Sequence, residues 1–71
     1  MKVTQQDKDA IVGTVNGSLN SQDKSVGSAV LAIVDKALNG DASAEGELRS
    51  VMDGMDQGTM LYSLCERIIE G

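Results

Sequence analysis

Apolar residues recur three and four positions apart along this chain, which is the spacing of amphipathic α-helices. Segment 25–38 has the widest apolar surface, because its apolar side chains spread over roughly 200° of the helix circumference, against the ~100° usual for a surface helix. These side chains are Val26, Ala29, Val30, Leu31, Ile33, Val34, Ala37 and Leu38. Such a helix must lie at the centre of its fold or against a second chain.

The first helix is predicted to begin after Thr4, a residue type that caps helix N-termini. Its apolar side chains form one narrow face of Ile11, Val12, Val15 and Leu19. Asn20-Ser21 is expected to end this helix and to cap the second, which runs from Gln22 or Ser25 to Leu38. Asn39-Gly40 is a stop signal, since glycine readily takes the left-handed position after a helix.

A third helix is predicted after a cap at Asp41 or Ser43, with one apolar stripe of Ala44, Leu48, Val51, Met52 and Met55. Gly54 and Gly58 bracket a turn before a last helix over about 59–70. That helix is expected to bury Met60, Leu61, Leu64, Cys65, Ile68 and Ile69. The pattern therefore predicts an all-α protein, with three to four short helices in a compact bundle or a helical-hairpin dimer.

The chain has 71 residues, which predicts one small helical domain over 1–71 with a thin core. Tyr62 is the only aromatic residue, and the single cysteine cannot form an internal disulfide. Neither large aromatic side chains nor a covalent link supports the core. Self-association is therefore the simplest remaining way for the fold to gain stability.

The net charge of −5 lies entirely in residues 41–71, which contain seven acidic residues and two arginines. The charges of residues 1–40 sum to zero. Direct nucleic-acid binding is disfavoured, because it needs a cationic surface that displaces counterions. The acidic half is expected to be a solvated face, with a basic partner or mimicry of a phosphate backbone as alternatives.

Neither a signal peptide nor a membrane span is predicted. Charged and amide residues at positions 5–9 occupy the place of a signal peptide's apolar region, and the longest apolar-rich run, 25–34, is too short to cross a bilayer. The unpaired cysteine fits a reducing compartment. We therefore expect a cytoplasmic protein that does not bind membranes.

Catalysis is hard to assemble from these residues. The chain lacks histidine, the usual base near neutral pH and a common metal ligand. Cys65 lies in the apolar face of the last helix and is expected to be a buried structural thiol, while Asp53 and Asp56 are expected to be solvated. The sequence predicts a protein that is not an enzyme, with no catalytic, cofactor-binding or metal-binding residue.

Segment 41–52 partly matches the calcium loop of an EF-hand. Asp41, Ser43 and Glu45 stand where the first three side-chain ligands stand, and Gly46 follows them. Met52 replaces the bidentate glutamate that closes the loop, so a helix N-terminus with capping residues is the preferred interpretation, and weak calcium binding stays an alternative. Asp41-Ala42-Ser43 also departs by one inserted residue from the Asp-Ser-Leu motif of acyl carrier proteins.

Residues 21–48 resemble the small enterobacterial connector and biofilm-regulator proteins. The shared features are Val26-Gly27, then Val30 and Ile33, a break at Gly40 and Leu48 in the next helix. The resemblance covers less than half of the chain and consists mainly of helix periodicity. It implies a helical dimer that regulates through protein contacts.

Taken together, the sequence predicts a small interaction protein of bacterial or phage type, a regulator or adaptor whose partner is another protein, including a second copy. The predicted anchors of the homodimer or partner interface are Val30, Leu31, Val34, Leu38, Leu61, Leu64, Ile68 and Ile69. The competing interpretation places these residues in the core of a monomer. The alternative functions are a secretion-type chaperone or apparatus subunit that binds a partner helix, and an acidic nucleic-acid mimic.

Overall fold

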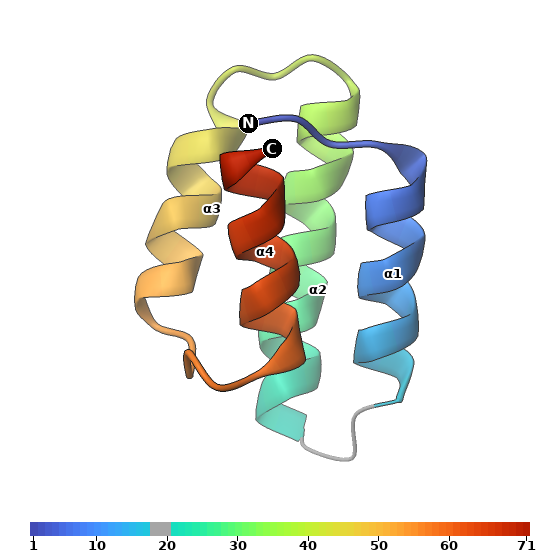
Figure 1. Cartoon of the computed structure of the whole chain (residues 1–71), viewed down its shortest axis with the longest axis vertical. Coiled ribbons are helices and arrows are strands. Elements are labelled where there is room, and N and C mark those ends of the chain that lie inside the picture. The colour runs from blue at the N-terminus through green and yellow to red at the C-terminus, as the bar shows by residue number, and fades with distance from the viewer. Residues whose placement is uncertain (18–20) are drawn as a thin grey trace.

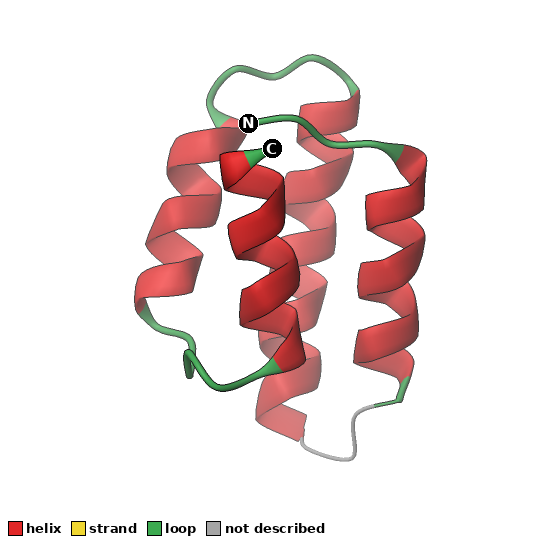
Figure 2. Cartoon of the chain, viewed as in Figure 1, coloured by secondary structure: helices red, strands yellow, loops and turns green. Residues whose placement is uncertain are grey.

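The computed structural model is a bundle of four antiparallel helices (Figure 1). It describes residues 1–17 and 21–71, with side chains at 1–17 and 24–71. The helices are α1 (Gln5–Asn16), α2 (Ser21–Leu38), α3 (Ala44–Asp53) and α4 (Met60–Glu70). Helices α1 and α3 each pack against both α2 and α4, and the described residues contain no strand (Figure 2). The predicted all-α helical bundle is therefore confirmed.

The start of α1 is held by the capping residue that the sequence predicts. The Thr4 hydroxyl accepts a hydrogen bond from the amide of Asp7 at 3.2 Å, and the Asp7 carboxylate accepts one from the amide of Thr4 at 3.0 Å. This reciprocal pair is a capping box, which satisfies two backbone donors that would otherwise lack a partner. The predicted cap at Asn20 and the predicted core residue Leu19 lie outside the described residues. The predicted end of this helix at Asn20-Ser21 is wrong, because α1 ends at Asn16, where the amide of Gly17 donates to the carbonyl of Gly13 at 3.1 Å.

Helix α2 ends at the predicted glycine. Gly40 has a φ of 88°, and its amide donates to the carbonyl of Ala37 at 3.0 Å. The amide of Asp41 donates to the carbonyl of Lys36, also at 3.0 Å. These two bonds form a Schellman motif, which needs a left-handed residue at the position of Gly40.

Asp41 and Ser43, the two alternative caps of α3, act together. Ser43 directly precedes α3, but its hydroxyl makes no bond to the amides of the helix. Instead, the amide and the hydroxyl of Ser43 both donate to Oδ1 of Asp41, at 2.9 and 2.7 Å. The carboxylate of Asp41 therefore orders the entry into α3, as an Asx turn does.

The core lies between the four helices and draws on all of them. Its buried members are Ile11, Val30, Ile33, Val34, Ala44, Leu48, Leu61, Cys65 and Ile68. The wide apolar arc of α2 is largely accounted for by this packing, because α2 has α1 on one flank, α3 on the other and α4 opposite (Figure 1). No described helix is long and apolar enough to cross a membrane.

Helices α1 and α2 approach most closely at Gly27, which is buried. A Cβ atom at this position would overlap Cγ2 of Val15 and lie 3.2 Å from its Cβ. Gly13, on the polar side of α1, has no such neighbour within 4 Å. Glycine is therefore needed for helix packing in α2, whereas Gly13 in α1 faces open space.

The prediction that Met60 is buried is wrong, because this side chain is 66% exposed. Met60 is the first residue of α4, one step of about 100° before the buried Leu61. This step moves it off the core-facing arc, which is centred on Leu61 and Ile68. The other predicted core residues of this helix are buried or half-buried, and Thr59 caps it by accepting a bond from the amide of Tyr62 at 3.2 Å.

Candidate interaction surface

The eight predicted interface residues do not form one surface. Four of them, Val30, Val34, Leu61 and Ile68, are buried in the core of the single chain. Leu31, Leu64 and Ile69 are half-buried against that core, and Leu38 is 37% exposed. An interface that used all eight would require the bundle to open, so the accessible surface must be sought on other side chains.

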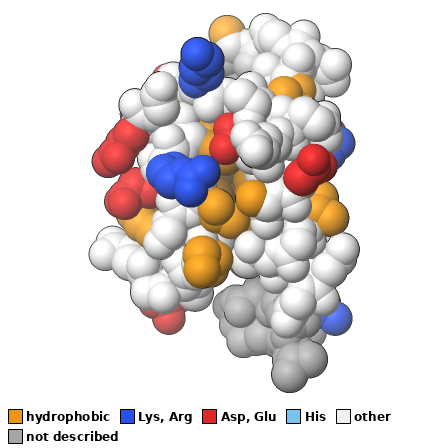
Figure 3. All heavy atoms as spheres, turned by 45° about the vertical axis from the view of Figure 1, so that its right-hand side comes forward, with side chains coloured by type: hydrophobic (Ala, Val, Ile, Leu, Met, Phe, Trp, Pro, Cys, Tyr) orange, Lys and Arg blue, Asp and Glu red, His pale blue; other side chains and the backbone are white. Residues whose placement is uncertain are grey.

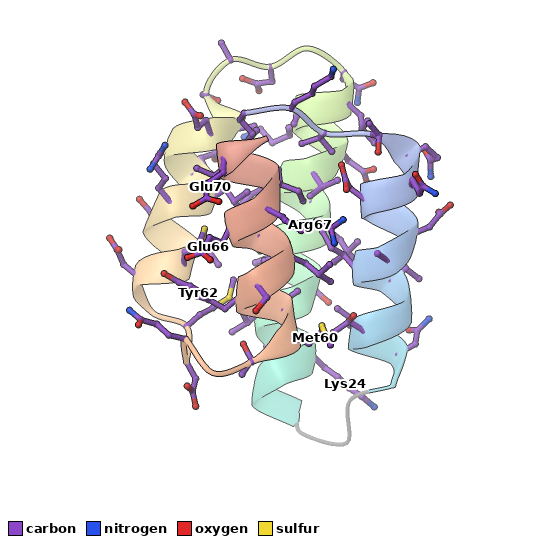
Figure 4. The ribbon with its side chains drawn as sticks, viewed as in Figure 1. Lys24, Met60, Tyr62, Glu66, Arg67 and Glu70 are labelled. Carbon is purple, nitrogen blue, oxygen red and sulfur yellow. The ribbon has the colours of Figure 1, made fainter. Side chains whose placement is uncertain are left out.

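The outward side of α4 presents a continuous set of exposed or half-exposed side chains, which we call the α4 face. Its members are Met60, Tyr62, Ser63, Glu66, Arg67 and Glu70. At about 100° per residue they occupy the half of α4 opposite to Leu61, Cys65 and Ile68. Figure 4 shows Tyr62, Glu66 and Glu70 on the flank toward α3, and Met60 and Arg67 on the flank toward α1.

Burial of Leu61, Cys65 and Ile68 determines which side of α4 is outward, because these side chains face the core. Exposed ion pairs contribute little to that choice, but they show which helix borders each flank. Arg67 lies 3.8 Å from Asp7, so this flank of α4 lies beside α1. On α3, Glu47 pairs with Lys36 at 2.6 Å, so that flank of α3 borders α2.

The α4 face combines residue types that are enriched in protein interfaces. Tyrosine, methionine and arginine are over-represented at such sites, and this chain has its only aromatic residue, its most exposed methionine and an arginine on one helix. Apolar side chains also gather near the middle of the face that the surface view shows (Figure 3). The sequence prediction missed this face because it placed Met60 in the core. The available signal was the cap at Thr59, which makes Met60 the first residue of α4.

The acidic residues differ in whether they are paired. Among the described residues, Asp9, Asp53, Asp56, Glu66 and Glu70 take part in no ion pair, and all but Asp9 lie in α4 or in the segment just before it. Glu66 and Glu70 are exposed on the α4 face, one helical turn apart, and Asp53 and Asp56 are exposed at the end of α3 and in the turn that leads into α4. Uncompensated negative charge therefore accumulates along α4 and its entry.

Polar contacts around the loop between α2 and α3 are, in contrast, internally satisfied. Hydrogen bonds from the hydroxyl and the amide of Ser43, with a smaller contribution from the charge of Lys36, lower the pKa of Asp41. The hydrogen bond to Glu47 raises the pKa of Lys36. These groups support the loop and are engaged with one another.

The calcium-loop comparison over 41–52 gains no support from the geometry. Glu45 turns toward Arg49 at 3.9 Å and toward the amino group of Met1 at 3.1 Å, while Asp41 is bonded to Ser43. In the described part of the chain, no three acidic or thiol side chains lie close enough together to hold a metal ion.

Cys65 lies in the core, as predicted, with no exposed surface. Burial raises the pKa of its thiol to about 11, because the apolar surroundings disfavour the thiolate. The thiolate is the nucleophilic form of cysteine, so this position suits a packing residue.

The end of the bundle that holds both termini has a hollow of about 270 Å³. It is lined by Met1, Val3, Ala37, Gly40, Asp41, Ala42 and Glu45. The N-terminal arm closes one side of it, where the amide of Lys2 donates to the carbonyl of Ile68 at 3.2 Å. Its carboxylates are those of Asp41 and Glu45, which already have the partners described above.

No family model, no curated protein and no solved structure matches this chain. The resemblance of residues 21–48 to bacterial connector proteins therefore stays a prediction.

Proposed function

We propose that this chain is a small non-catalytic regulator or adaptor that acts through protein contacts made by its α4 face. The observation that favours this function is Met60, which is 66% exposed on a helix that also presents Tyr62. The exposed methionine and the half-buried tyrosine, on opposite flanks of α4, supply two separate apolar contacts for a partner. The core residues explain the stability of the bundle but leave Met60 without an internal role.

The alternatives from the sequence remain proposals of the same kind. A secretion-type chaperone would use the α4 face to bind a helix of its client, which is one form of the function proposed above. A nucleic-acid mimic would use only the exposed carboxylates, and an interface with a second copy would use apolar side chains. The contribution of Met60 and Tyr62 separates the mimic from the other two.

A capture experiment with matched surface variants tests the proposal. The immobilised wild-type protein, a variant with Met60→Ser and Tyr62→Ser, and a control with Ala29→Ser and Ala32→Ser are exposed to a cell extract. Both control positions are exposed on α2, away from the α4 face. We expect the wild type and the control to retain the same proteins, and the α4 variant to lose them. Identical sets on all three would contradict the proposal, provided that circular dichroism shows all three to be folded.

A further inference from the structure

We propose that the partner of the α4 face is a basic amphipathic helix of another protein. This inference rests on the proposed function and adds the chemical class of the partner. The α4 face has three properties that favour such a partner: unpaired negative charge, an apolar side chain on each flank, and the regular spacing of an exposed helix.

Unpaired carboxylates lie on α4 and beside its N-terminal end. Glu66 and Glu70 project from α4, and Asp53 and Asp56 flank its entry, with no cationic side chain in an ion pair with any of them among the described residues. The cation on the same face, Arg67, lies on the opposite flank beside Asp7. Opposite charge on a partner both speeds the encounter and selects its orientation, so the flank toward α3 favours lysine or arginine.

The α4 face also has two apolar side chains. Met60 stands at the first turn of α4, and the half-buried Tyr62 follows on the flank that also bears the two glutamates (Figure 4). Met60 lies on the flank toward α1 and Tyr62 on the flank toward α3, so a segment lying along the outward side of α4 would contact one of them with each of its own flanks. A purely basic segment would leave these side chains unused, whereas an amphipathic segment also offers apolar side chains to them. Methionine adapts its shape to such side chains because its own is unbranched and flexible.

The side chains on the flank of α4 toward α3 are regularly spaced. Tyr62, Glu66 and Glu70 follow one another at intervals of four residues and form a ridge along α4. Ridges of this kind pack into the grooves between the ridges of another helix. A partner helix with basic residues one turn apart would match the rise of about 6 Å between the two glutamates.

A second copy of this chain does not provide such a helix. Its lysines are spread singly over residues 2–36, and two of them, Lys8 and Lys36, are already paired with Asp35 and Glu47. Two α4 faces would also bring their own carboxylates together. The charge therefore favours a different protein as the partner.

The test is a titration with fluorescent synthetic helices of about 18 residues, or five turns. The probe has leucine at i, i+3, i+4 and i+7 with lysine on the flanks. One control peptide replaces each lysine with glutamate, and the other keeps the composition but scrambles the leucine spacing. Binding is followed by fluorescence anisotropy at low and high salt.

Two charge variants locate the site. One carries Glu66→Gln and Glu70→Gln on the α4 face, and its matched control carries Asp9→Asn and Asp35→Asn on α1 and α2, so that each gains two units of charge. We expect the wild type to bind the lysine helix at least ~10-fold more tightly than either control peptide. The α4 variant should bind it about 5-fold more weakly than the wild type, while the control variant should be within about 2-fold.

Three outcomes would overturn the inference. Equal weakening in both charge variants would mean that only net charge matters, and equal binding of the scrambled peptide would mean that no helix is recognised. Absence of preference for the lysine helix would exclude a basic partner. This last result leaves the proposed function standing if the Met60 and Tyr62 variant still loses its captured proteins, so the two proposals fail separately.

Discussion

Gly27 allows α1 and α2 to pack closely, because its side chain is a single hydrogen atom. With no side chain at this position, Val15 of α1 packs directly against the backbone of α2. Glycine normally weakens a helix interior by roughly 0.5–1 kcal/mol relative to alanine, so its place in the middle of α2 is a local cost. The close contact between α1 and α2 offsets that cost.

Gly27→Ala is therefore expected to destabilise the protein by about 1 kcal/mol, because overpacking against Val15 outweighs the gain in helix propensity. Gly13→Ala, with no neighbour within 4 Å, should instead stabilise it by about 0.5–1 kcal/mol. Urea unfolding of both variants measures the difference. Adding Val15→Ala to Gly27→Ala should recover part of the loss. A stabilised Gly27→Ala variant would show that the two helices can separate freely.

Asp41 provides a pH-dependent contribution at the same scale. Its folded-state pKa lies below the ordinary value of 3.8, because Ser43 and Lys36 favour the carboxylate. A lowered pKa contributes stability that is present above the unfolded value and is lost as the pH falls through the folded value. Asp41→Ala should therefore be less stable than the wild type at neutral pH, and the difference should shrink in acid below pH 3.8. Unfolding midpoints over this range check it; a constant difference would contradict the assigned cause.

At the scale of the element, the predicted helix ends at Thr4 and Gly40 have physical partners, whereas the predicted cap Ser43 makes no side-chain bond to the amides of α3. The capping box at Thr4, the Schellman motif at Gly40 and the Thr59 cap satisfy backbone groups that a short helix leaves unpaired. Such caps matter most in short helices, which are marginal by themselves. Helix α4 has 11 residues and also presents the candidate surface, so its stability bears on function.

Thr59→Ala should lower the free energy of unfolding by about 1 kcal/mol, since it removes the side-chain acceptor for the amide of Tyr62. Thr59→Ser, which keeps the hydroxyl, is the matched control and should stay within a few tenths of a kcal/mol of the wild type. Thermal and urea unfolding measure both. Equal stability of the alanine and serine variants would mean that the cap contributes nothing to α4.

At the scale of the whole molecule, the bundle encloses apolar surface that the sequence leaves open between a dimer interface and the core of a monomer. Each helix covers part of the arc of its neighbours, and the large hydrophobic side chains classed as exposed in the described part of the chain are Met1, Leu38 and Met60. A stable dimer normally buries roughly 800 Å² on each partner, with an apolar centre. Most side chains that would form that centre here are inside the chain.

Light scattering coupled to size exclusion should therefore give the mass of one chain, 7.4 kDa, at moderate concentrations. The physical reason is that burial of Val30, Val34, Leu61 and Ile68 within the monomer leaves little apolar surface for a second copy. A mass of twice this value, lost on Met60→Ser, would instead identify the α4 face as a self-interface. A dimer that this change leaves intact would point to the remaining predicted anchors.

Local sequence was sufficient for the existence of the helices and for some of their ends, but α1 ends at Asn16, before its predicted end. Thr4, Gly40 and Thr59 act through backbone atoms a few residues away, so their roles follow from neighbouring positions alone. The burial of Leu48, Cys65 and Ile68 also follows, because these residues lie on the central line of their apolar stripes. The edges of the stripes were less certain, and Met60 was assigned to the wrong side.

The sequence by itself determined the all-α class, the helix ends at Thr4 and Gly40 and the acidity of the second half, because periodicity, capping and charge are local or additive properties. Only the tertiary structure decided which helix flanks meet, that Gly27 rather than Gly13 is the point of close approach, and that Val30 and Val34 are core while Met60 is surface. The helical pattern of a sequence shows that apolar side chains must be buried. Whether the cover comes from the same chain or another depends on contacts between residues far apart in sequence.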